Sequence, residues 1–177
     1  EMPIQYTGIL DEHQAVRQAA GIFDISHMGE VFVSGPAAEE FLNGILTNDL
    51  RKLVPGQGQY TLMCQRDGGV IDDLFAYRIG AVDFLLIINA SRAEVDFAWL
   101  TARLLEFPRR DEVQLTNASD RLSAVAVQGP ATPRFIDQVF PGPCDDPASL
   151  ANRPSDLKRN RISVFSFGGT PVWFART

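Results

Sequence analysis

The chain has 177 residues, of which 45% are apolar and 21% charged, and its formal net charge is −6. This composition is typical of a globular protein with one or two domains and a sizeable core. Nucleic-acid-binding proteins usually carry a basic patch. Here the basic residues are scattered and outnumbered by acidic ones, so we expect no nucleic-acid partner.

Metal and membrane partners are also excluded by composition. The chain holds two histidines and two cysteines, far apart in the sequence, so a zinc or iron site has almost no ligands to draw on. No apolar run approaches the length of about 18 residues that a membrane span needs, and the chain does not open on a signal-peptide pattern. It begins at Glu1 and ends at Thr177 directly after a strand-like run, so we expect a piece of a longer protein.

The first part of the chain predicts a helix, two strands and a second helix, at residues 10–20, 23–25, 30–33 and 36–46. Asp11 and Glu12 favour a helix start, because carboxylates interact well with the positive end of the helix dipole. Pro36 is accepted in the first turn of the second helix. The corner that holds Met28 either forms the floor of a binding pocket or fills a gap in the core.

The middle of the chain predicts a hairpin, a further strand and a third helix, at residues 59–65, 70–79, 84–89 and 91–105. The Asp67-Gly68-Gly69 segment supplies the turn of the hairpin. The strand at 84–89 is continuously apolar, which is typical of a central strand covered on both sides. Ser91 and Glu94 match a capping box at the start of the third helix.

The last part predicts two strands, a helix and a second hairpin, at residues 112–115, 122–128, 131–140, 162–167 and 172–175. A strand–Gly-Pro–helix unit at Gly35-Pro36 is repeated at Gly129-Pro130. Together these elements indicate an α+β fold, with mixed or antiparallel sheets and packed helices.

One strand carries the most unusual residue of the chain. Side chains alternate between the two faces of a strand, so Asp73 shares an otherwise apolar and aromatic face with Phe75 and Tyr77. A carboxylate on such a face needs a partner or a function. The alternatives are an edge-like or bulged strand with a solvated Asp73, or a functional carboxylate. Asn89, at the end of the next strand, either meets a ligand or completes a turn.

Several motifs in one order resemble the glycine-cleavage T-protein, or aminomethyltransferase, family and its wider folate-binding relatives. The resemblance extends over the whole chain. The motifs are Gly21-Ile22-Phe23-Asp24-Ile25-Ser26-His27-Met28-Gly29-Glu30, Thr47-Asn48-Asp49, Gln59-Tyr60, Gly68-Gly69-Val70-Ile71-Asp72-Asp73-Leu74, Asn89-Ala90 and Val127-Gln128-Gly129-Pro130.

The resemblance implies a three-domain parent of about twice this length. Residues 32–131 would form an inserted α+β domain, and residues 1–31 and 132–177 would be parts of a discontinuous domain. The C-terminal barrel-like domain of the family would lie outside this chain.

The resemblance also implies a site and a reaction. Asp73 would be the catalytic carboxylate, and the tetrahydrofolate site would be lined by Met28, Tyr60, Asp73, Tyr77 and Asn89, with no metal. The reaction moves an aminomethyl group from a lipoylated carrier, the H-protein, to tetrahydrofolate and releases ammonia. The expected compartment is the cytoplasm, or the mitochondrial matrix in a eukaryote.

Three alternatives remain open at this point. The parent could be another folate-dependent demethylase or one-carbon transferase, or a non-enzymatic folate-binding accessory protein. The chain alone could also be an inactive folded piece of an active enzyme.

Overall fold

The computed structural model describes residues 4–144 and 151–177. Its helices are α1 (Ile9–Gln18), α2 (Ala38–Ile45), α3 (Ala93–Glu106) and α4 (Thr132–Val139). Its strands are β1 (Gly21–Asp24), β2 (Gly29–Ser34), β3 (Gln57–Cys64), β4 (Val70–Arg78), β5 (Asp83–Ile88), β6 (Gln114–Asn117), β7 (Val125–Gln128), β8 (Arg161–Phe167) and β9 (Thr170–Arg176). The predicted helices and strands all form, with ends that shift by a few residues.

The strands build one large sheet and one small one. The large sheet has the order β6-β2-β5-β4-β3-β8-β9, and β1 pairs with β7 in the small one. Every ladder between the named strands is antiparallel. The α+β prediction is therefore confirmed, and β5 is a central strand as its apolar run predicts.

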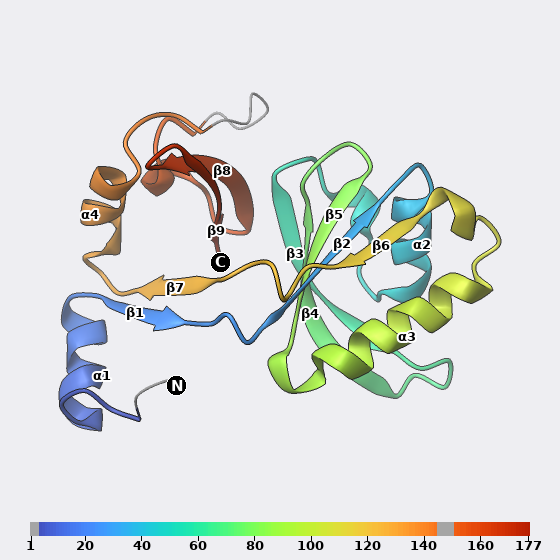
Figure 1. The fold of residues 1–177 in the computed structure, drawn as a ribbon, viewed down its shortest axis with the longest axis horizontal. Helices are drawn as coiled ribbons and strands as arrows, with labels where there is room; N and C mark the ends of the chain where they lie inside the picture. The colour runs from blue at the N-terminus through green and yellow to red at the C-terminus, as the bar shows by residue number, and fades with distance from the viewer. Residues whose placement is uncertain (1–3, 145–150) are drawn as a thin grey trace.

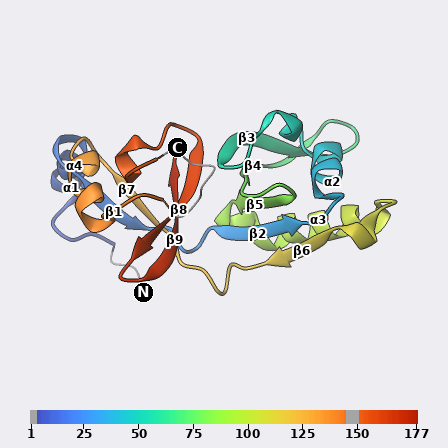
Figure 2. The same cartoon turned by 90° about the horizontal axis from the view of Figure 1, so that it is seen from above.

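The elements gather in two groups, which Figures 1 and 2 show from two sides. Strands β2 to β6 lie with α2 and α3, whereas α1, β1, β7 and α4 lie together with the β8–β9 hairpin. The hairpin joins the large sheet through a single ladder pair between Gln57 and Arg161. The domain boundaries drawn from the resemblance stay a prediction. Residues 1–3 and 145–150 of the predicted flanking pieces lie outside the described residues.

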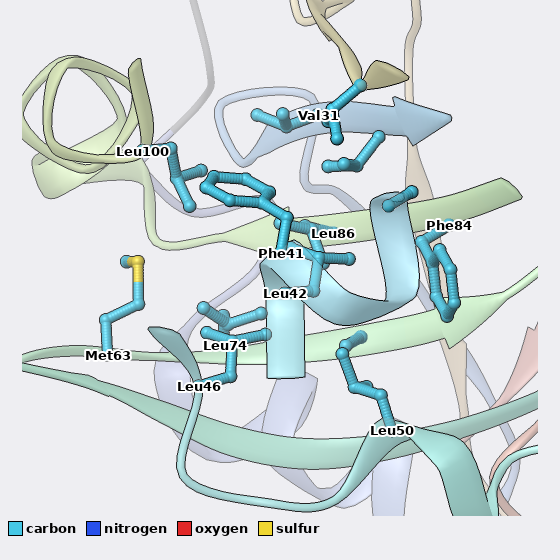
Figure 3. Packing of buried hydrophobic residues seen from close by; sticks show 14 of the residues in the cluster. Val31, Phe41, Leu42, Leu46, Leu50, Met63, Leu74, Phe84, Leu86 and Leu100 are labelled. Atoms are coloured by element: carbon cyan, nitrogen blue, oxygen red, sulfur yellow. The ribbon is translucent and has the colours of Figure 1, made fainter. Parts of the chain in front are cut away.

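The main core lies between the large sheet and two helices. Phe41 and Leu42 of α2 and Leu100 of α3 are at most 1% exposed and meet Leu74 and Leu86 of the sheet (Figure 3). Each buried leucine or phenylalanine of this kind stabilises a fold by about 1.5–3 kcal/mol through the hydrophobic effect. This face of the sheet is covered, so a binding site on the same strands has to use the other face.

Turn chemistry sets the register of the β3–β4 hairpin. Gly68 has φ 90°, a value that favours glycine, and the Gly69 N–H donates to the Asp67 carboxylate at 3.0 Å. The Gln65 N–H closes the turn on the Gly69 carbonyl at 2.7 Å. The predicted turn is confirmed, and it fixes which β4 side chains face the core.

One predicted capping motif is wrong. Ser91 lies in a short 3-10 turn (Ala90–Arg92), and α3 begins at Ala93 without a side-chain cap. The Asn89 side chain, at the start of that turn, does not cap it either, and its amide donates to β4. The local capping signal is thus not used at this helix start.

The two strand–Gly-Pro–helix units have the same local structure. Gly35 follows β2 with φ 115°, and Gly129 follows β7 with φ 126°. A Cβ atom at either glycine would collide with a backbone carbonyl, that of Glu112 or that of Ala19. The repeated dipeptide thus marks two places where a strand turns into a helix against another segment of backbone.

Candidate functional site

Strand register brings three of the predicted site residues to one end of the large sheet. Leu74 of β4 and Gly29 of β2 both pair with Ile88 of β5. The next residues in register, Asp73, Asn89 and Met28, therefore follow side by side across β4, β5 and β2. These residues are far apart in the sequence, so the sheet itself assembles the candidate site.

Asp73 lies on the face of the sheet opposite the main core. Its partner in the β3 ladder is Leu62, and Phe75 pairs with Tyr60 two residues further along. Paired residues in an antiparallel ladder share a face, so Tyr60 is the diagonal neighbour of Asp73. The alternation predicted for this strand is confirmed from Asp72 to Arg78 and breaks at Ile71. Asp73 is half-buried, and the register shifts between Met63 and Cys64, which pair with Asp72 and Val70, so that Ile71 is the extra residue of a bulge and packs against the main core.

Tyr60 and Asp73 interact electrostatically. The Asp73 carboxylate lies close enough to the Tyr60 hydroxyl to raise the pKa of Tyr60 above its ordinary value. The Tyr60 side chain is 54% exposed. The pair therefore presents a flat ring and a carboxylate to solvent, which is a suitable surface for a planar ligand with amine groups.

Tyr77 takes a different position from Tyr60. Its ring stacks near Phe75 with centroids 4.6 Å apart, and it packs with Leu85 and with Ile162 of β8. It is 2% exposed, and burial raises the pKa of Tyr77 to about 12. Gly58 leaves room for both rings, because a Cβ there would overlap them. Tyr77 is thus a buried part of the aromatic face, while Tyr60 is accessible.

Asn89 is held by β4. Its side-chain amide donates to the Asp72 carboxylate and to the Asp73 carbonyl, both at 3.0 Å. Met28 ends a tight turn, with its N–H bonded to the Ile25 carbonyl at 3.0 Å, and is half-buried. The Asn89 side chain is therefore fixed on β4 by its amide group.

Two buried carboxyl groups close to this site were not predicted from the sequence. Glu30 of β2 is 4% exposed, faces the same side as Asp73, and burial raises its pKa. Asp96 of α3 is fully buried beside Asp72. The burial of Asp96 could have been predicted from the helical period, because Asp96 precedes the buried Leu100 by four residues.

Two hollows in the described part of the chain lie elsewhere. One of about 410 Å³ and another of about 460 Å³ are both lined by Gln65, Arg66, Trp99 and Arg103, between the hairpin turn and α3. Asp73, Tyr60 and Tyr77 line neither hollow. Within the residues described, no group of three or more metal-ligating side chains is found, and no helix is long and apolar enough to cross a membrane.

Comparison with known families identifies this arrangement. The family model of the GCVT N-terminal domain matches residues 1–177. The chain belongs to this family. The aminomethyltransferase of Chlorobaculum parvum is 47% identical over 176 residues, which are 99% of this chain and 45% of that protein. The aminomethyltransferase of Chlorobaculum tepidum is 52% identical over 141 residues, 80% of this chain and 38% of that protein.

Solved structures show a similar fold in other proteins. The crystal structure of glycine cleavage system aminomethyltransferase T from Bartonella henselae matches with a TM-score of 0.73 and 32% identity, over 91% of this chain and 40% of that one. The heterotetrameric sarcosine oxidase of Corynebacterium sp. U-96 matches with a TM-score of 0.54 and 19% identity, over 95% of this chain and 77% of that one. The second likeness concerns the fold alone. This GCVT chain thus spans less than half the length of its aminomethyltransferase relatives.

Proposed function

We propose that the chain forms the folate-binding face of a glycine-cleavage aminomethyltransferase. The whole enzyme would take the one-carbon unit from the aminomethyl-lipoyl group of a carrier protein, transfer it to tetrahydrofolate and release ammonia. The proposal is supported by relatives named aminomethyltransferase at 47% identity over 176 residues. The observation that carries it is the contact between Asp73 and the exposed ring of Tyr60 on an aromatic sheet face.

Asp73 would act by electrostatics. Its carboxylate accepts hydrogen bonds from the amine groups of the folate and offsets the positive charge that develops on the one-carbon unit as ammonia leaves. Fixed charges that are aimed at developing charge act strongly in a site from which the ligand excludes water. The Tyr60 hydroxyl lies near this carboxylate and would help to orient it. No metal is needed for this role.

The other site residues would shape and orient the ligand. The Tyr60 ring offers a flat wall, and the buried Tyr77 ring packs on the same face and keeps it rigid. Asn89 and Met28 border the end of the face, one through its amide oxygen and the other through its thioether. The expected compartment of the enzyme is the cytoplasm, or the mitochondrial matrix in a eukaryote.

The proposal is tested on the full-length enzyme with a lipoylated carrier protein and tetrahydrofolate. We expect Asp73→Asn to lower the rate of aminomethyl transfer by on the order of a hundredfold, since removing one preorganised electrostatic group has effects of that size. Folate binding, measured by fluorescence titration, should persist. Asp111→Asn is the matched control, because Asp111 has a side chain that is 98% exposed.

Each contrary result has a distinct meaning. Full activity of Asp73→Asn would reject the assigned role of the carboxylate. A wild-type enzyme that binds folate but transfers no aminomethyl group would reject the reaction, and would favour a folate-dependent demethylase or an accessory folate-binding protein.

A further inference from the structure

A buried carboxyl group lies directly behind the candidate site. Asp96, in the first turn of α3, is 0% exposed and contacts the carboxyl group of Asp72 on β4. Within residues 4–144 and 151–177, no N–H or O–H group donates to either oxygen of Asp96 or to Oδ2 of Asp72. Two carboxylates in contact repel each other, so a proton between them is the arrangement that satisfies both.

The surrounding charges assign the proton to Asp96. Burial raises the pKa of Asp96 to about 7, with further contributions from Asp72 and Asp73 that outweigh the opposing charge of Arg92. Asp72 behaves in the opposite way. Burial opposes its ionisation, but hydrogen bonds from Asn89 and the Asp73 N–H, together with the neighbouring Asp96 carboxyl group, outweigh it and lower the pKa of Asp72.

Asp72 links this pair to the candidate site. Its Oδ1 accepts the Asp73 N–H at 2.9 Å and the Asn89 amide at 3.0 Å, and the same amide also bonds to the Asp73 carbonyl. The Asp72 carboxylate thus holds both the backbone of Asp73 and the side chain of Asn89. Any group that fixes Asp72 also fixes the two residues that border the ligand.

We propose that Asp96 is a positioning residue, whose protonated carboxyl group donates a hydrogen bond to Asp72 and thereby holds Asp73 and Asn89 in place for folate. Loss of that proton places two carboxylates against each other beneath the site. The Asp73 N–H and the Asn89 amide then lose the fixed position of Asp72 Oδ1, the atom to which both donate. The catalytic part of this inference rests on the proposed function, whereas the shared proton does not.

The first measurement follows the proton without using activity. A protonated buried carboxyl group has its own carbonyl band in the infrared spectrum, which we expect in the wild-type full-length protein at pH 6 and not in Asp96→Asn. Proton linkage gives a second readout. The folded state holds a proton that the unfolded state releases between pH 3.8 and about 7, so wild-type stability falls relative to that of Asp96→Asn as pH rises through this range. Absence of both effects would overturn the shared proton.

The second measurement tests positioning. Asn at position 96 is neutral and can donate to Asp72 at every pH, so Asp96→Asn should match the wild-type kcat/KM at pH 6. Its kcat/KM relative to the wild type should then rise severalfold, up to about tenfold per pH unit, above pH 7. Asp96→Ala, which cannot donate, should be impaired at both pH values.

A control variant and the contrary outcome complete the test. Glu94→Gln changes an exposed carboxyl group on the same helix and should leave the ratio to wild type independent of pH. If Asp96→Asn shows the infrared and stability effects but the same pH–rate profile as the wild type, the proton is structural and the positioning role is rejected. If the wild type transfers no aminomethyl group, the same ratio is measured on the dissociation constant of tetrahydrofolate, and a flat ratio again rejects positioning.

Discussion

The two faces of the large sheet are built from the same strands and differ in almost every other respect. On the helix-covered face, Val31, Leu74 and Leu86 are at most 2% exposed and belong to one apolar cluster. On the opposite face, Asp73 is half-buried and Tyr60 is 54% exposed. One face is filled by the chain itself, and the other presents a charge and an aromatic ring to solvent.

This difference separates stability from recognition on single strands. Leu74 and Asp73 are neighbours on β4, yet one contributes to the core and the other to the candidate site. A strand allows this because successive side chains point to opposite faces. Substitutions of adjacent residues should therefore affect different properties, and the following predictions test that separation.

The largest effect is expected on the helix-covered face. Leu86→Ala removes a fully buried side chain from the central strand and should lower the free energy of unfolding by about 2–5 kcal/mol, as the cavity left behind adds to the lost burial. Chemical denaturation of the full-length protein measures it. Leu105→Ala, at a residue that is 63% exposed, should change stability by less than about 0.5 kcal/mol. Equal effects of the two variants would contradict the packing described for this face.

An intermediate effect is expected at Gly58, which lies against the aromatic rings on the sheet face opposite the helices. A methyl group in Gly58→Ala would overlap Phe75 and Tyr77, so we expect a loss of about 1–3 kcal/mol in stability and weaker folate binding. Gly44→Ala is the matched control. Its added methyl group meets no atom within 4 Å in a helix, and it should stabilise the protein by about 0.5–1 kcal/mol. Tight folate binding by Gly58→Ala would show that the rings do not shape the site.

The smallest effect is expected on the pKa of Tyr60, on the sheet face opposite the helices. The nearby Asp73 carboxylate raises the pKa of Tyr60, so Asp73→Asn should lower that pKa toward the ordinary tyrosine value and leave overall stability almost unchanged. Absorbance of the phenolate against pH measures it, and Tyr60→Phe identifies the signal. An unchanged Tyr60 titration in Asp73→Asn would mean that the two side chains do not interact in solution.

Local patterns predicted the elements but not the exact contacts of the site. The alternation around Asp73 and the Asp67-Gly68-Gly69 turn are encoded within a few residues. The β3–β4 hairpin and the sheet face on which Asp73 lies could therefore be predicted from the sequence. The capping box at Ser91 was wrong because Ser91 lies inside a short 3-10 turn, and the α-helix begins only at Ala93.

The remaining site features depend on residues distant in sequence. The proximity of Met28 to Asn89 follows from the register of β2 against β5, and the burial of Tyr77 follows from Ile162, which lies far along the chain. Sequence reading placed Tyr60 and Tyr77 in one role, but the fold exposes the first and covers the second. The importance of Asp96 appears only when α3 packs on β4.

The junction between the β8–β9 hairpin and the large sheet has a consequence for motion. One ladder pair joins β8 to β3, supported by backbone bonds from Gly58 to Asn160 and from Ile162 to Gly56, whereas five pairs join β4 to β5. Segments with few shared hydrogen bonds open locally at a lower free energy than the whole fold. Amide hydrogens at this junction should exchange with solvent sooner than those of β5. Tyr77 can then become accessible through a local fluctuation, while the core beneath the helices stays closed.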